Sequence, residues 1–146
     1  MVRAARTTEA IEYPESDEMG EHALQWFITK LLCGLVIRHL AARGVTAYVA
    51  GNQFFYWVEG DPKACCAPDL YVVLGVPQDV PDVAIWRVWE GHRPAFALEV
   101  VSAKWQKDYD EIPASYAAMG CKELILFDPG VTARSRRRVR WQVYRT

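Results

Sequence analysis

The sequence lacks the patterns that mark several common classes of functional site. Its four cysteines form no Cys-x-x-Cys pair, and its three histidines do not lie at zinc-finger spacing from them. It also has no glycine-rich dinucleotide- or NTP-binding loop and no Gly-x-Ser-x-Gly sequence. These absences argue against a zinc finger, a nucleotide-binding fold and an α/β-hydrolase. We interpret the cysteines as reduced thiols and expect a cytoplasmic protein.

Long hydrophobic runs and a charge excess are also missing. The most apolar run, Leu31–Ile37, lies between Lys30 and Arg38 and is too short to span a bilayer. The N-terminal segment has no apolar stretch before Glu21, unlike a signal peptide. We therefore expect no membrane partner. The formal net charge is −1, so a site for nucleic acid has to be a local patch.

What the sequence does contain is the pattern of one α/β domain. The chain has 146 residues, of which 51% are hydrophobic, enough for one core. We expect residues 1–18 to form a flexible arm and residues 19–146 a single domain. The apolar periodicity predicts an amphipathic helix over 18–43, strands over 45–50, 53–58, 70–74, 86–89, 95–101, 123–127 and 139–144, and a second helix from Asp108 or Asp110 to Met119, with Pro113 in its first turn. This order indicates helices packed around one mixed sheet.

Two acidic residues stand at or inside apolar strands. Asp69 lies where the strand 70–74 begins, and Glu99 lies within the strand 95–101. A carboxylate in such a run is costly unless it is paired or bound to a metal. On neighbouring strands, about 4.8 Å apart, the two would repel each other unless a proton or a cation lay between them. Carboxylate oxygens suit Mg²⁺ or Mn²⁺, so we predict a metal site. The alternative is that Asp69 caps a turn and Glu99 pairs with an arginine.

An ordered set of motifs resembles a known family. Pro68-Asp69 followed by Glu99-Val100-Val101-Ser102 resembles the split motif of the PD-(D/E)XK superfamily, which is restriction endonuclease-like. The wider set is similar to the Uma-two family of restriction endonucleases, and it consists of Tyr13–Asp17, Gly51-Asn52, Pro68–Val73, Leu98–Ser102, Lys107–Tyr109, Tyr116-Ala117, Gly120 and Glu123–Pro129. The resemblance implies a mixed central β-sheet flanked by helices and a Mg²⁺-dependent endonuclease that hydrolyses DNA.

The resemblance also implies roles for individual residues. Asp69 and Glu99 would bind the metal, the backbone carbonyl of Val100 would add a ligand, and Glu21 on the first helix would complete the site. The alternative for Glu21 is that its charge only favours the N-terminus of the helix.

The sequence departs from the superfamily at the lysine that usually serves the attacking water. The usual position, two residues after the glutamate, is Val101, and the position that many relatives use is Ile112. The remaining candidates are Lys104 and Lys107, whose ammonium would help to deprotonate the water and stabilise the phosphate charge. The alternative is that both are exposed loop charges. Without a lysine, the chain would be a weak or inactive nuclease-fold domain that binds DNA or protein.

A dense group of arginines follows the Asp128-Pro129-Gly130 turn: Arg134, Arg136, Arg137, Arg138 and Arg140. These side chains could contact DNA phosphates and make binding sensitive to salt. We favour the alternative of a solvated turn beside an edge strand that is protected by charge. DNA is the expected partner, and cutting of both strands by so small a nuclease would be simplest for a homodimer.

Overall fold

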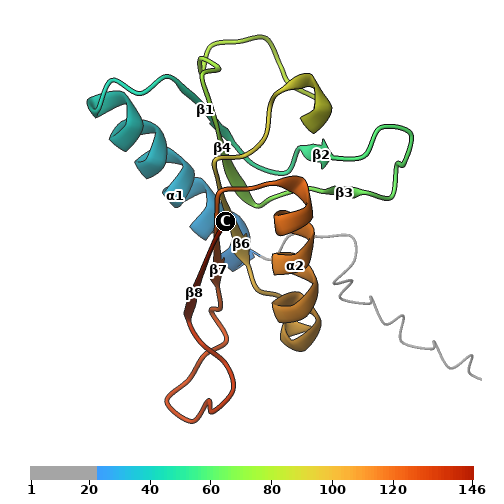
Figure 1. The fold of residues 1–146 in the computed structure, drawn as a ribbon. Coiled ribbons are helices and arrows are strands. Elements are labelled where there is room, and N and C mark those ends of the chain that lie inside the picture. The colour runs from blue at the N-terminus through green and yellow to red at the C-terminus, as the bar shows by residue number, and fades with distance from the viewer. Residues whose placement is uncertain (1–22) are drawn as a thin grey trace, which may run out of the picture.

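The computed structural model describes residues 23–146, so the predicted arm and the predicted start of the first helix lie outside the described residues (Figure 1). A five-stranded sheet forms the centre of this part. Its strands lie in the order β1 (Ala47–Ala50), β4 (Leu70–Leu74), β6 (Phe96–Val100), β7 (Glu123–Phe127) and β8 (Trp141–Arg145). Only β6 and β7 are parallel; the other neighbours are antiparallel. The predicted mixed sheet is confirmed.

Two helices cover the two faces of this sheet, α1 (Ala23–Ala42) on one and α2 (Trp105–Met119) on the other (Figure 1). Side chains along β6 alternate between the faces, as the period of two requires. Ala97 packs in the core on the α2 side, and Leu98 packs against α1. The sheet is therefore buried on both sides where β4 and β6 run, which is where the two predicted acids lie.

A small second sheet contributes to the core on the α2 side. It consists of β3 (Cys65–Cys66), β2 (Phe54–Tyr56) and β5 (Ile85–Arg87), and β5 leads into a 3-10 turn, η1 (Val88–Glu90). Phe55 and Trp86 are buried and stack with ring centroids 5.8 Å apart, and the indole N–H of Trp86 donates to the hydroxyl of Tyr71 in β4. The prediction of a single sheet is therefore wrong, since the predicted strands 53–58 and 86–89 lie in this separate sheet. Strand β3 was not predicted, because two cysteines give no strand pattern.

Helix α1 is less amphipathic than predicted. Ile28, Leu32 and Cys33 pack on the β4 and β6 side chains. Five large apolar residues of the same helix are more than half exposed: Leu24, Trp26, Phe27, Leu31 and Leu35. By length and composition α1 could cross a membrane, so our argument from the shorter run was incomplete. In this structure its contact with the sheet is limited, since Thr29 is the one buried residue of α1.

Helix α2 begins earlier than predicted, at Trp105, so Pro113 lies in the helix interior and not in its first turn. The cause is the loop that follows β6. The Asp108 carboxylate accepts hydrogen bonds of 2.7 Å from both the backbone N–H and the hydroxyl of Ser102. The carboxylate thus closes the preceding loop and does not cap its own helix. The predicted end is confirmed, since Gly120 has the left-handed φ of 79°.

Candidate metal centre

Asp69 and Glu99 lie side by side at one end of the central sheet. Strands β4 and β6 are antiparallel and pair Leu70 with Leu98, so the next pair outward places Asp69 opposite Glu99. Asp69 is buried, with 5% of its surface exposed, and Glu99 is partly buried. This is the juxtaposition that the predicted metal site requires.

The pair has no compensating cation among residues 23–146: no lysine or arginine there forms an ion pair with Asp69 or Glu99. The alternative in which Glu99 pairs with an arginine is therefore wrong for the described residues. Burial, followed by the charge of Asp69, raises the pKa of Glu99 well above its ordinary value. The arrangement favours a proton or a cation at Glu99.

Asp69 is held by two neutral donors. The backbone N–H of Val100 donates to its Oδ2 and the side-chain amide of Gln25 donates to its Oδ1, both at 2.7 Å. Gln25 projects from α1, and the sequence analysis missed it. Rotation of the Gln25 side-chain amide would exchange the positions of its oxygen and its N–H group. Gln25 can therefore also offer an oxygen ligand to a cation. The available signal was its spacing, four residues after Glu21.

The backbone of Val100 faces the same acid. The N–H of Val101 donates to the carbonyl of Phe127 in β7, so the backbone groups of Val100 face β4, where its N–H meets Asp69. Its carbonyl therefore lies on the side for which the resemblance implied a ligand. Glu21 lies outside the described residues. Within residues 23–146 there is no group of three or more His, Cys, Asp or Glu that could hold a metal, so further ligands there would have to be other oxygens, such as amide, hydroxyl or carbonyl groups or water.

A tyrosine fixes the other carboxylate. The buried hydroxyl of Tyr116, from α2, donates a short hydrogen bond to Glu99 Oε1. Cys66 of β3 lies in the same environment, where burial and the charge of Glu99 raise the pKa of its thiol to about 12. The thiol therefore stays protonated at neutral pH. The motif set contained Tyr116, but nothing in the sequence indicated its contact with Glu99.

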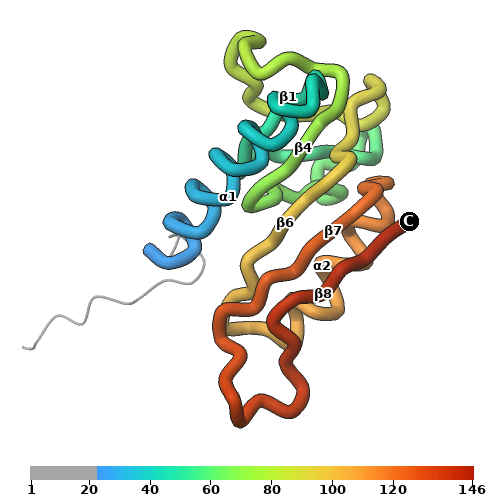
Figure 2. The backbone as a smooth tube through the Cα atoms, turned by 90° about the vertical axis from the view of Figure 1, so that its left-hand side faces the viewer, coloured from blue at the N-terminus to red at the C-terminus, as the bar shows by residue number. Residues whose placement is uncertain are grey.

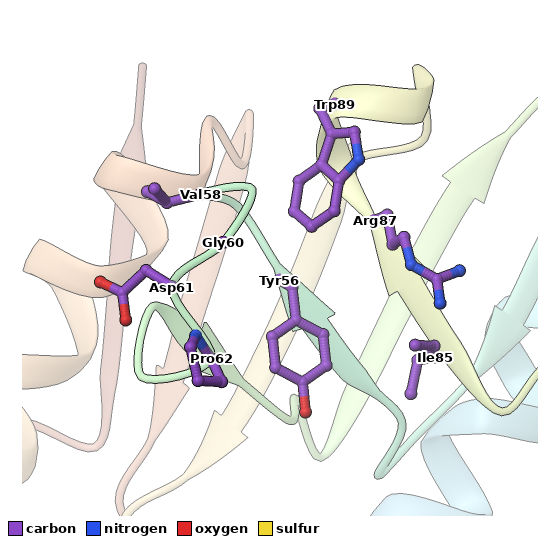
Figure 3. A pocket seen from close by; sticks show the side chains of 8 residues that line it. All are labelled: Tyr56, Val58, Gly60, Asp61, Pro62, Ile85, Arg87 and Trp89. Carbon is purple, nitrogen blue, oxygen red and sulfur yellow. The ribbon is translucent and has the colours of Figure 1, made fainter.

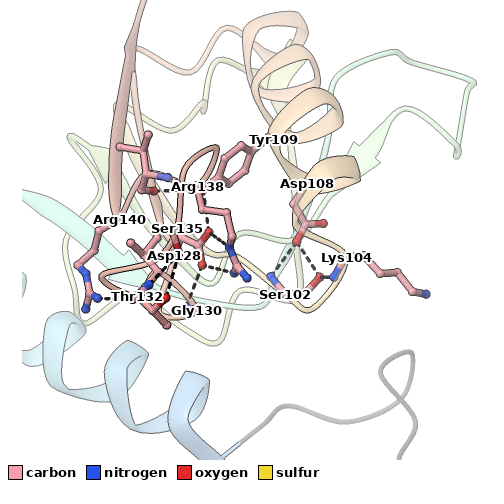
Figure 4. A network of polar contacts seen from close by, with 12 residues as sticks. Ser102, Lys104, Asp108, Tyr109, Asp128, Gly130, Thr132, Ser135, Arg138 and Arg140 are labelled. Atoms are coloured by element: carbon pink, nitrogen blue, oxygen red, sulfur yellow. Dashed lines mark hydrogen bonds and ion pairs between the residues drawn. The ribbon is translucent and has the colours of Figure 1, made fainter.

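The two candidate lysines lie at the start of α2. The ammonium of Lys107 is 3.7 Å from Glu111 Oε2, and both side chains are more than 60% exposed. Lys104 is exposed, and Figure 4 shows its side chain extending away from Ser102 and Asp108. Val101, at the usual lysine position, is buried in the core with α2. A role for either lysine at the carboxylates stays a prediction.

A glycine turn supports the backbone of Asp69. The N–H of Asn52 donates to the carbonyl of Pro68 at 2.7 Å. A Cβ on Gly51 would lie 2.1 Å from the carbonyl oxygen of Asp69, well inside van der Waals contact. The Gly51-Asn52 turn therefore fits closely against the segment that carries the first carboxylate.

A separate pocket lies on the small sheet, where Tyr56, Arg87 and Trp89 surround it with the Gly60-Asp61-Pro62 turn (Figure 3). None of the residues that line it belongs to the predicted site. The candidate metal-binding carboxylates therefore lie at the end of β4 and β6 and not in this pocket.

The model of a family described as "Uma2: Putative restriction endonuclease" matches residues 11–145. The chain belongs to the Uma2 family. The resemblance is thereby confirmed, and membership supports a nuclease-like function. No curated protein matches this Uma2 chain.

Among solved structures, the Uma2 chain is similar to the crystal structure of "a putative nuclease belonging to DUF820" from Anabaena variabilis ATCC 29413. The two share 14% sequence identity with a TM-score of 0.52, over 84% of this chain and 68% of the other. At that identity the likeness shows the fold alone, and it confirms the nuclease-like fold class.

Proposed function

We propose that this Uma2 protein is an endonuclease that hydrolyses DNA phosphodiester bonds with Mg²⁺ or Mn²⁺. The observation that carries the proposal is the pair of carboxylates, Asp69 directly before β4 and Glu99 in β6, with no ion pair to a described cation. Such a pair is costly in the metal-free protein, and a divalent cation offsets that cost.

The residues present fit a hard cation. Asp69 and Glu99 would hold it, with the Val100 carbonyl, the Gln25 amide oxygen and Glu21 as further candidates. When bound, such an ion supplies a polarised water and neutralises charge on the phosphate. Tyr116 holds Glu99 in one orientation by its hydrogen bond. Asp69 is held by Val100 N–H, so neither carboxylate needs to reorganise on binding.

In this proposal Lys104 or Lys107 serves the attacking water. The ion pair of Lys107 with Glu111 is exposed, and such pairs contribute only about 0–1 kcal/mol. Releasing the ammonium toward a bound phosphate therefore costs little. Lys104 stands at the first position before α2, directly after the loop that leaves β6.

Plasmid nicking with Mn²⁺ tests the proposal. Asp69→Asn and Glu99→Gln each remove a charge without changing the size of the side chain. We expect both to reduce nicking by more than about 100-fold, beyond the typical effect of groups around a metal ligand. Chelation should abolish wild-type cutting. The control is Asp110→Asn, an exposed acid on α2, which should leave the rate unchanged. Equal cutting by all four proteins would refute the proposed site.

The second candidate is a nuclease-fold domain that binds DNA or protein without cutting. The observation that favours it is the absence of lysine at positions 101 and 112. Calorimetric titration with Mn²⁺ separates the two. Mn²⁺ binding that depends on Asp69, together with no nicking of any DNA, would select the second candidate.

A further inference from the structure

The loop that joins β7 to β8, residues 128–140, lies at the same end of the sheet as the candidate metal centre; we call it the basic loop. Strands β6 and β7 are parallel and pair Val100 with Phe127, so β7 ends beside the residues that carry the centre. Figure 2 shows the basic loop projecting beyond that end of the sheet.

The base of the basic loop is fixed by one buried acid. Asp128 is completely buried and receives two hydrogen bonds from Arg138, at 2.8 Å from Nε and 2.5 Å from Nη2 (Figure 4). It also accepts from the Tyr109 hydroxyl at 2.7 Å and from the Gly130 N–H at 2.9 Å. The two ends of the loop are therefore joined to each other and to α2. The Arg138 guanidinium lies over the ring of Trp105, 5.5 Å from its centroid, so this arginine has a structural role.

The middle of the basic loop has its own turn. The Ser135 hydroxyl accepts from the Thr132 N–H at 2.9 Å, and the Ser135 N–H donates to the Thr132 carbonyl at 3.0 Å. Nearer β8, Arg140 Nη2 donates to the Val131 carbonyl at 2.6 Å. These bonds reduce the conformational entropy that the loop would lose on binding a partner.

Three arginines of the basic loop are available to bind a partner. Arg134, Arg136 and Arg137 are exposed, and no acid of residues 23–146 forms an ion pair with any of them. The chain as a whole has a net charge of −1, so this excess of positive charge is local. A turn that only protects an edge strand needs no rigid support. The hydrogen bonds at Asp128 nevertheless give the basic loop such a support. The interpretation as a solvated turn therefore explains less than a binding surface does.

We propose that Arg134, Arg136 and Arg137 hold the phosphate backbone of duplex DNA next to the carboxylate pair. The choice of DNA as the polyanion rests on the proposed function. Arginine binds phosphate oxygens by paired hydrogen bonds, and such contacts position a duplex without reading its sequence. The basic loop thus supplies affinity and placement, and the metal centre supplies the chemistry.

Fluorescence anisotropy of a labelled duplex, with Ca²⁺ in place of Mg²⁺ to prevent cutting, tests this proposal. The loop variant combines Arg134→Ala, Arg136→Ala and Arg137→Ala. The matched control removes the same charge at the opposite end of the sheet, in three exposed residues: Arg38→Ala, Arg43→Ala and Lys122→Ala. Thermal unfolding of both variants should match that of the wild type, since these surface changes alter stability by less than about 0.5 kcal/mol.

We expect the loop variant to bind at least about 10-fold more weakly than the control, by the same factor for two unrelated sequences. The slope of log K against log salt should fall by about 0.9 for each lost contact. A second variant with lysine at the three positions should keep the slope, which separates lost charge from a misfolded loop. Equal losses in the loop variant and the control, an unchanged slope, or tighter binding of single-stranded RNA would overturn the proposal.

This experiment does not depend on hydrolysis. Loss of binding in the loop variant of a protein that never nicks DNA would support the basic loop and refute the endonuclease. Nicking that requires Asp69, with unchanged binding by the loop variant, would do the reverse.

Discussion

Asp128 and the pair formed by Asp69 and Glu99 lie at the same end of the Uma2 sheet, but their electrostatic surroundings differ. Asp128 is surrounded by donors, one of them the charged Arg138. Burial acts to raise the pKa of Asp128, but the hydrogen bonds from Arg138 and Tyr109 hold it below its ordinary value. Glu99, beside Asp69, has a raised pKa, and its donors within residues 23–146 are neutral: the Tyr116 hydroxyl and the backbone of Asp69. The comparison distinguishes an acid that stabilises the fold from a pair that has no positive partner among residues 23–146.

The two groups should therefore respond to pH with opposite signs. Asp128 binds its proton less readily in the folded state, so its contribution to stability is present above its ordinary pKa of 3.8 and is lost as the pH falls. Glu99 binds its proton more readily in the folded state. In the metal-free protein it therefore lowers stability as the pH rises above its ordinary pKa of 4.5.

The largest expected effect is on the compensated acid. Arg138→Ala leaves the Asp128 charge buried without its cation, which typically costs about 3–5 kcal/mol. Urea unfolding at pH 7 measures this loss, and Arg136→Ala in the same loop is the control, with an expected change within about 0.5 kcal/mol. Equal free energies of unfolding for the two variants would show that the ion pair between Arg138 and Asp128 does not stabilise the fold.

A smaller effect, of opposite sign, is expected at the uncompensated pair. At pH 8 without metal, Glu99→Gln removes a buried charge and should raise Tm by about 2–4 °C, the shift that about 1 kcal/mol produces in a chain of this size. The difference should shrink as the pH is lowered from 8 to 5, because the raised pKa makes the wild-type carboxyl take up its proton in this direction. Mg²⁺ should raise the Tm of the wild type more than that of the variant. A variant less stable than the wild type at both pH values would contradict this account.

The smallest expected effect is at the hydrogen bond to Glu99. Tyr116→Phe removes one donor, worth about 0.5–1.5 kcal/mol, which corresponds to about 2–10-fold weaker Mn²⁺ binding. Because that bond lowers the pKa of Glu99, its loss should also move the pH midpoint of Mn²⁺ binding upward. Titrations across pH measure both quantities. Tyr144→Phe, which removes a hydroxyl bonded to Gln142, should leave the midpoint unchanged.

The sequence was most informative for strands with continuous apolar runs and for the acids at or within such runs. The bounds of β4 and β7 match the prediction to the residue, because continuous apolar runs end there in clear turn signals. The same reasoning found Asp69 and Glu99, since a carboxylate within such a run is costly. It also gave the faces of β6, because side chains alternate along a strand.

Contacts between distant segments were beyond the sequence. Gln25 and Tyr116 reach the carboxylates from two helices, 44 and 17 residues away along the chain. Among five neighbouring arginines, no local pattern showed that Arg138 turns inward to Asp128. The early start of α2 was missed because the bond from Ser102 to Asp108 closes a loop that periodicity does not describe.

Gly51 has a consequence for the genetic tolerance of the domain. Any larger residue there must displace the carbonyl of Asp69, and with it the backbone of one member of the acid pair. In a library of all amino acids at this position, activity should therefore fall at the first added methyl group and should not decline gradually with side-chain volume. Glycine at position 51 would then be as invariant among active clones as Asp69 and Glu99.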